Sequence, residues 1–301
     1  MSSAVECRKL FKRYQCKTAL DGLTCTIEAN RITGVIGRNG AGKTTLLNLI
    51  VGHKRASEGE LRVFGEAPFN SLRVSANTIF ITDTMNLPNG MTCYEILETG
   101  RQFYPNWDHE LGVRLFDYFG FTKRDIHDRL SKGKRSTFNA IFGLASRCPL
   151  TIFDEPTTGM DEAVRKDFYR ALLKDYLAYP RTVLLSSHHL NEIEDLLEDV
   201  LLIKSGREHM HIPISDMKEY ALAVRGKERA VTNWLGRKDI IARRSGPPGE
   251  VTVIVRNDLD HDQFNEAKEN KLELSQVSAS DLCVYLTEER KGGIDDVFNR
   301  D

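Results

Sequence analysis

Several features that would decide a function class at once are missing from this 301-residue sequence. The six cysteines form no CxxC pair, and no histidine lies at metal-ligand spacing, so neither a zinc site nor a disulfide framework is predicted. We expect buried or idle thiols in a reducing cytosol. Acidic and basic residues nearly cancel, leaving a formal net charge of -1, which argues against a general nucleic-acid binder.

Long apolar runs are missing as well. The stretch NAIFGLASRCPLTIF (139–153) is interrupted by Arg147 and Pro149 and is too short to span a bilayer. The opening residues MSSAVECRKL contain no apolar segment of the kind that a signal peptide needs. Any role at a membrane is therefore expected to pass through a partner protein.

Short apolar runs alternate with helical patterns in the first two thirds of the sequence, which is typical of an α/β core. A helical section is predicted at about 92–147. Buried strands are predicted at 32–37, 150–156, 182–188 and 200–206. Together these elements predict a first domain over residues 1–214.

After about residue 215 the pattern changes to strand, helix, strand, strand, helix, strand. That order is typical of the split βαβ or ferredoxin-like unit, so a small α+β domain is predicted over 215–301. A final helix is expected in SASDLCVYLTEER, begun by a serine cap. A regulatory or dimerisation role and a simple packing role are equally compatible with this domain.

The strongest motif is GRNGAGKTT, which lies between a predicted strand and a predicted helix. It fits the phosphate-binding pattern G-x-x-x-x-G-K-[ST], in which backbone N–H groups wrap the phosphates and the helix directs its positive end at them. The lysine adds a charge to the β and γ oxygens, and the following threonine can ligate Mg²⁺. The predicted nucleotide-binding residues are Gly37, Arg38, Asn39, Gly40, Ala41, Gly42, Lys43, Thr44 and Thr45.

Acidic and histidine side chains end two other predicted strands. LTIFDEP places Asp154 and Glu155 at a strand's carboxyl end, where open α/β sheets bind ligands. Asp154 is predicted to hold Mg²⁺ and Glu155 to activate water; by themselves the two could be a solvated strand end. His188 ends LLSSH and is favoured over His189 for contact with the γ-phosphate.

Taken together, these residues resemble the ATPase subunit of an ATP-binding-cassette (ABC) transporter over roughly residues 5–210. The resemblance identifies GRNGAGKTT as Walker A, LTIFDEP as Walker B and SSH as the switch-histidine motif. It further implies that Tyr14 stacks on adenine and that Asp161, in TTGMDE, is the D-loop acid. LSKGK occupies the position of the family's signature.

Two positions depart from the family pattern. The family usually has a glutamine at the end of the strand that follows the phosphate-loop helix. In this sequence the stretch TIFITDTMNLP has Asp83 at that position, and its carboxylate oxygens can still contact the metal. The signature LSGGQ is altered by Lys132 and Lys134 but keeps Ser131 and Gly133, which the resemblance implies contact the γ-phosphate of a second subunit. The alternative, a chance basic helix start, does not explain the Walker B motif downstream.

The resemblance implies an ATPase that uses ATP and Mg²⁺ (Thr44, Asp154 and Asp83), works as a head-to-tail homodimer or heterodimer, and powers transmembrane permease subunits from the cytoplasmic face of the cell membrane. The LSKG form and FYPNWD are similar to bacterial exporter cassettes. Direct nucleic-acid binding is not expected.

The alternative is a non-transport ABC protein acting on DNA or the ribosome. The DNA-repair members of the family have a long coiled coil between the phosphate loop and the signature. Here only about 87 residues separate Gly42 from Leu130, and they contain no sustained heptads. A P-loop kinase would not explain the signature, the D-loop or the histidine.

Overall fold

The computed structural model describes residues 3–85, 87–188, 190–236 and 238–288. The chain divides into two compact units, residues 1–214 and 215–301, and each is described by itself. The competing candidate His189 lies outside the described residues, as does the end of the predicted final helix beyond residue 288. No helix in the described ranges combines the length and apolar character needed to cross a membrane.

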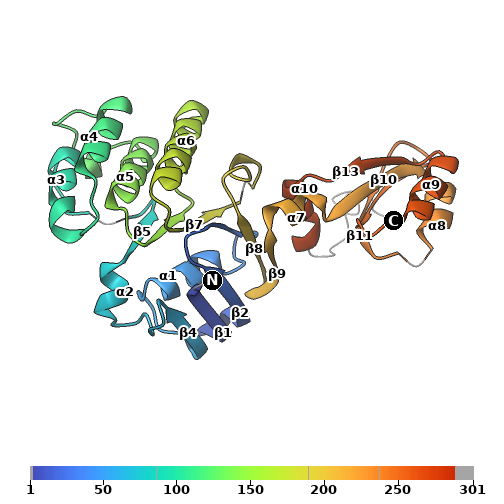
Figure 1. Ribbon diagram of the computed structural model, residues 1–301, viewed down its shortest axis with the longest axis horizontal. Coiled ribbons are helices and arrows are strands. Elements are labelled where there is room, and N and C mark those ends of the chain that lie inside the picture. Colours follow the sequence, from blue (N-terminus) through green and yellow to red (C-terminus); the bar gives the residue numbers. More distant parts are fainter. Residues whose placement is uncertain (1–2, 86, 189, 237, 289–301) are drawn as a thin grey trace. The chain divides into compact units, whose positions relative to one another are not determined.

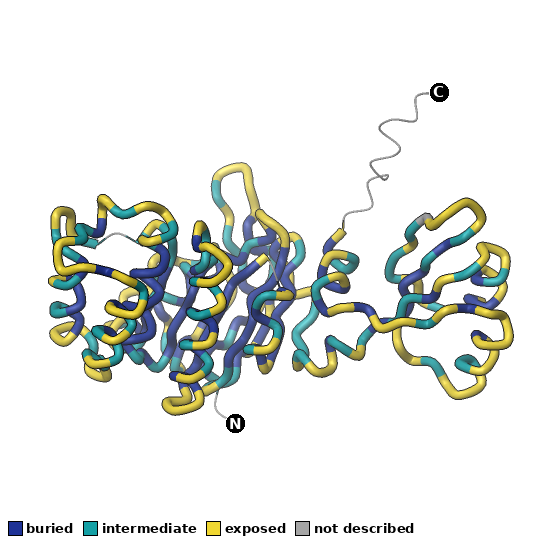
Figure 2. Tube along the Cα trace, turned by 90° about the horizontal axis from the view of Figure 1, so that it is seen from above, coloured by how far each residue is buried: buried dark blue, intermediate teal, exposed yellow. Residues whose placement is uncertain are grey.

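A six-stranded sheet forms the centre of the first unit (Figure 1). Its order is β5-β6-β7-β3-β8-β9, and every neighbouring pair is parallel except β8 and β9. The three central strands are buried along their whole length, which agrees with their continuous apolar sequences, and Figure 2 shows the buried stretches. The strands are β3 (Ile32–Ile36), β5 (Thr78–Thr82), β6 (Leu150–Asp154), β7 (Thr182–Ser187), β8 (Asp199–Lys204) and β9 (Arg207–Pro213).

A second, antiparallel sheet was not predicted from the sequence. It has the order β2-β1-β4 and is built from β1 (Ser3–Tyr14), β2 (Lys17–Glu28) and β4 (Glu58–Val63). Register shifts interrupt the pairing of β1 with β2 at several points, so the two-residue alternation of apolar side chains is broken in the sequence. Its buried face, including Leu10 and Leu20, shares one apolar core with helix α1 (Lys43–Ile50) and β8.

Helices cover the rest of the first unit. The predicted helical section contains α3, α4 and α5, which pack against one another (Figure 1). Thr92 and Glu95 form a reciprocal capping box at the start of α3, and the last eleven residues of α5 are buried. The helices are α2 (Leu72–Ala76), α3 (Cys93–Phe103), α4 (His109–Tyr118), α5 (Lys132–Ser146) and α6 (Glu162–Ala178), with single turns η1 (His127–Arg129) and η2 (Leu190–Glu192).

The second unit contains a four-stranded antiparallel sheet of order β11-β12-β10-β13. Helix α8 connects β10 to β11, with β12 lying between these two strands in the sheet, and α9 connects β12 to β13, with β10 between them. This is the split βαβ arrangement. Val224, Val231 and Trp234 are among the residues of its own apolar core. Its elements are α7 (Ile214–Glu219), β10 (Ala221–Lys227), α8 (Glu228–Leu235), β11 (Ile240–Ser245), β12 (Glu250–Arg256), α9 (His261–Glu269), β13 (Glu273–Gln276) and α10 (Ala279–Thr287).

A buried ionic cluster ties three elements of the first unit together. Asp175 on α6 contacts Arg147, which follows α5, at 2.9 Å and Arg181, which precedes β7, at 2.8 Å. The side chains of Asp175 and Arg181 are 4% and 5% exposed. The cluster therefore links α6 to the segments that lead into β6 and β7.

We expect Asp175→Asn to lower the free energy of unfolding of the first unit by about 3 kcal/mol, because it leaves the buried guanidinium of Arg181 without its carboxylate. Arg147 loses one of its two carboxylate partners and keeps Asp108. Urea unfolding followed by circular dichroism measures the change. Asp167→Asn on the same helix is the matched control, since its ion-pair partner Arg170 is 75% exposed and an asparagine can still accept from the Tyr118 hydroxyl. We expect it to cost under about 1 kcal/mol. Equal costs for the two variants would show that the cluster does not stabilise the fold.

Candidate nucleotide-binding site

The loop from β3 to α1 has the conformation that a phosphate-binding turn needs. Gly42 precedes the helix with φ 112°, in the left-handed region. A Cβ at this position would lie 2.6 Å from the carbonyl oxygen of Ala19, so both the backbone angle and the space require glycine. The first turn of α1 therefore directs its N–H groups outward at the loop, as an anion-binding helix start does.

Lys43 is a buried cation at the start of this helix. Its residue is 6% exposed, its Nζ donates to the carbonyl of Gly37 at 2.7 Å, and the Glu155 Oε1 atom lies 3.9 Å away. Burial lowers the pKa of Lys43, while the Glu155 and Asp154 carboxylates oppose that shift. An ammonium held this way, beside a loop of N–H groups, suits a polyanionic ligand.

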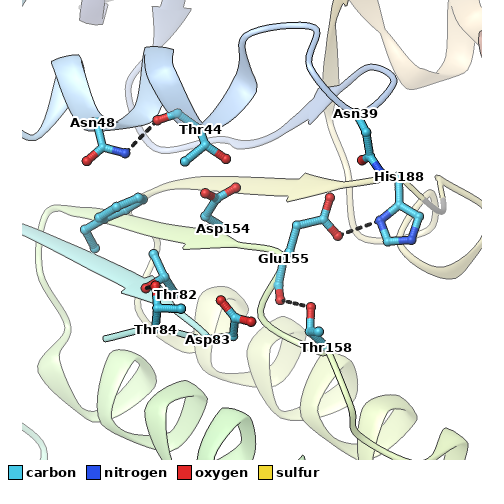
Figure 3. Close-up of a pocket in the computed structure, with 11 residues that line it drawn as sticks. Asn39, Thr44, Asn48, Thr82, Asp83, Thr84, Asp154, Glu155, Thr158 and His188 are labelled. Atoms are coloured by element: carbon cyan, nitrogen blue, oxygen red, sulfur yellow. Dashed lines mark hydrogen bonds and ion pairs between the residues drawn. The ribbon is translucent and has the colours of Figure 1, made fainter. Parts of the chain in front are cut away.

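A pocket of about 450 Å³ opens beside the loop (Figure 3). It brings together six residues that the sequence predicted: Asn39, Thr44, Asp83, Asp154, Glu155 and His188. Asp83 follows β5, Asp154 ends β6 with Glu155 directly after it, and His188 follows β7. Because these strands are parallel neighbours, their carboxyl ends meet at one edge of the sheet.

Oxygen atoms face one another across the pocket. Thr44 projects from α1 toward Asp154 in Figure 3. Asp154 is 6% exposed, and its Oδ1 accepts a hydrogen bond from the Ser186 hydroxyl. Hydroxyl and carboxylate oxygens are the ligands that Mg²⁺ prefers, so Thr44, Asp154 and the nearby Asp83 form a donor set that fits this ion.

Glu155 is held in an unusual backbone conformation. Its φ is 50°, which a residue with a side chain adopts at a cost that the surrounding structure must offset. Its N–H donates to the Ser186 hydroxyl at 3.0 Å, and its Oε2 accepts from the Nδ1 atom of His188 at 2.7 Å. This arrangement aims a carboxylate at the pocket and fixes its direction from the neighbouring strand.

Four predicted residues outside the phosphate loop do not line the pocket. Among the described residues that line it, neither Ser131, Gly133, Asp161 nor Tyr14 is present. Ser131 caps α5, accepting from the N–H of Lys134 at 3.4 Å, and Asp161 caps α6. Both side chains therefore accept a hydrogen bond from the first turn of the helix that they begin.

Gly133 and Tyr14 have distinctive surroundings. A Cβ on Gly133 would lie 2.2 Å from the carbonyl oxygen of Gly159, so α5 begins in close contact with the segment after β6. Tyr14, at the end of β1, has the ammonium groups of Lys12 and Lys54 at 5.1 Å and 4.9 Å from its ring centroid. The half-buried ring therefore has a cation–π contact with each of these lysines.

Sequence reasoning missed several residues that line the pocket: Asn48, Phe80, Thr82, Thr84 and Thr158. Asn48 could have been found, because it lies one helical turn after Thr44, and its side chain donates to the Thr44 carbonyl at 2.7 Å. Thr158 donates to the carbonyl of Glu155 at 2.9 Å, a contact that the motif TTGMDE does not specify.

Comparisons with known proteins agree with this geometry. Residues 20–158 match the family model described as "ABC transporter". The ABC transporter ATP-binding protein YtrB of Bacillus subtilis (strain 168) is 26% identical over 71% of this chain and 74% of its own length. The Nod factor export ATP-binding protein I of Sinorhizobium fredii (strain NBRC 101917 / NGR234) is 28% identical over 84% of this chain and 71% of its own.

The solved structure of an ATP-binding subunit of an ABC transporter shares the fold. Its TM-score is 0.64, with 22% identity, over 72% of this chain and 92% of that chain. The residues that match the family model, 20–158, include the phosphate loop, Asp83, helix α5 and the two carboxylates Asp154 and Glu155.

We expect Gly42→Ala to weaken ATP binding at least tenfold, because a Cβ would collide with the Ala19 carbonyl and displace the loop. Isothermal calorimetry with ATP measures the loss. Gly65→Ala is the matched control: its φ of 81° is also left-handed, but nothing lies within 4 Å of the added atom. Both variants are strained by about 1 kcal/mol, so a similar loss of affinity in the two would contradict the steric role of Gly42.

Proposed function

Because the first unit of this chain is an ATP-binding cassette of the ABC transporter family, we propose that the chain hydrolyses ATP to drive a membrane partner in export. The observation that carries the proposal is Glu155, aimed at the pocket between Lys43 and His188. Export is supported by the relative named for Nod factor export. The same relatives favour transport over the alternative role on DNA or the ribosome.

In this proposal the phosphate loop and Lys43 hold the triphosphate, and Glu155 is the general base. Glu155 takes a proton from water, the water oxygen forms a bond to the γ-phosphorus, and the bond from that phosphorus to the β–γ bridging oxygen breaks. ADP leaves with the electron pair of that bond. His188 donates from Nδ1 to Glu155 and thereby keeps the carboxylate directed at the water.

We infer that Mg²⁺ accompanies the nucleotide. Thr44 and Asp154 would hold it, with Asp83 close enough to take part, since their oxygens line one pocket. When bound, the ion supplies positive charge that offsets the charge of the β and γ oxygens.

The site is completed by a second cassette in this proposal. Ser131 is exposed at the start of α5, where its hydroxyl and the N–H of Gly133 can reach the γ-phosphate held by a partner subunit. Tyr14 stacks on the adenine of its own subunit, and Asp161 lies between the two sites. Because ATP joins the two surfaces, it favours the closed dimer, and hydrolysis reopens it.

The membrane partner is proposed to dock on the helical section and the Asp83 loop. Phe103 at the end of α3 and Tyr118 at the end of α4 are 71% and 64% exposed, and large exposed apolar side chains are typical of interaction surfaces. The protein is then peripheral, on the cytoplasmic face of the membrane, bound to transmembrane permease subunits.

Glu155→Gln should reduce ATP turnover by about 10²-fold or more, because the amide cannot accept the proton, and leave ATP binding intact. Phosphate release and calorimetry measure the two quantities. Glu110→Gln, the same change at an exposed position of α4, should leave both unchanged. Undiminished turnover in Glu155→Gln would rule out its role as the base.

Ser131→Arg should block ATP-induced dimerisation, since a long side chain replaces the hydroxyl at the proposed contact with the partner's γ-phosphate. Size-exclusion chromatography in the Glu155→Gln background, where ATP persists, measures the dimer. Ser75→Arg, at an exposed serine of α2, is the control. A normal ATP-induced dimer in Ser131→Arg would contradict the signature assignment.

A further inference from the structure

The two positions at which this chain departs from the family pattern meet in space. The Nζ atom of Lys132 lies 3.3 Å from the Oδ2 atom of Asp83. Their side chains are 62% and 30% exposed, and Asp83 lines the nucleotide pocket while Lys132 opens helix α5. Glutamine and glycine, which the family pattern places at these positions, could not form this ion pair.

The backbones that carry the two residues are already fixed to each other. Asn139 on α5 donates from Nδ2 to the carbonyl of Thr82, directly before Asp83, at 2.9 Å. The Oδ1 atom of the same amide accepts from the Nε2 atom of His127 at 2.8 Å, and both residues are buried. The ion pair therefore costs little conformational entropy beyond that of the two side chains.

The stem of Lys132 is also held in place. A Cβ on Gly159 would lie 3.3 Å from the Cγ atom of Lys132, so the lysine packs over the glycine that follows the Walker B strand. Lys134, two residues along, lies instead with its Nζ atom 5.6 Å from the Phe121 ring centroid. The two added lysines thus have different surroundings, and it is Lys132 that faces the pocket rim.

The charges of the pocket explain what this lysine contributes. Three carboxylates line the pocket, those of Asp83, Asp154 and Glu155. Lys43 and His188 contact Glu155, and the Ser186 hydroxyl donates to Asp154. Lys132 is the cation paired with Asp83, so it offsets a negative charge that would otherwise face an incoming triphosphate.

We propose that Lys132 is a positioning residue that acts through Asp83: it holds this carboxylate at the pocket rim and neutralises it, which lets ATP bind where the family has an uncharged amide. The proposal rests on the proposed function. It also means that an ion pair joins the signature segment to the Asp83 loop of the same chain. A displacement of one segment would therefore change the position of the other.

The test is a double-mutant cycle on ATP affinity with EDTA present, so that no divalent cation competes for Asp83. Lys132→Glu should weaken ATP binding about fivefold more in the natural chain than in the Asp83→Gln variant, a coupling at the upper end for an exposed ion pair. Lys132→Arg, which keeps the charge, should retain the natural affinity. Thermal unfolding without nucleotide checks that each variant is folded.

Lys134→Glu is the matched control, because it makes the same charge change two residues along the same helix. Its effect on ATP affinity should be the same with Asp83 or with glutamine at position 83. Coupling below about twofold between Lys132 and Asp83, or equal coupling for Lys134, would overturn the proposal. An unsubstituted chain that binds no ATP would instead refute the proposed function, which the cycle reports separately.

Discussion

The buried ammonium of Lys43 is the charge around which the rest of the site is arranged. It is 6% exposed, bonded to the Gly37 carbonyl and close to Glu155, and burial of a cation is costly unless compensating groups surround it. Water reaches it poorly, so a phosphate that enters the pocket meets a charge that solvent hardly screens. The glycines of the loop matter because they let the backbone stay close to that same ligand.

The parallel sheet supplies the other groups without long loops. β5, β6 and β7 are consecutive neighbours, and their carboxyl ends deliver Asp83, Asp154, Glu155 and His188 to one pocket. The conformational strain of this arrangement lies at Glu155, whose backbone is in the left-handed region. The buried Asp175 cluster stabilises the segments that precede β6 and β7, so the positions of these pocket side chains are set by the core rather than by the surface.

The cassette fold was predictable because its strongest signals are local. The phosphate loop requires glycine at Gly42 for steric reasons, and the buried strands are continuous apolar runs, so motif order alone specified the α/β sheet. The antiparallel sheet of β1, β2 and β4 was missed because bulges break its alternation. The pair of Lys132 and Asp83 was also beyond sequence reasoning, since each was noted as a separate departure and only the packing of α5 on β5 brings them together.

The exposed position of Ser131, apart from the pocket of its own chain, has a kinetic consequence. If two chains must meet before either site is complete, the turnover rate of dilute protein rises with the square of its concentration and becomes proportional to it only when dimers predominate. A permease that holds two cassettes together would replace that dependence by a fixed effective concentration. The assembly, and not the abundance of the free subunit, would then set the rate of ATP consumption.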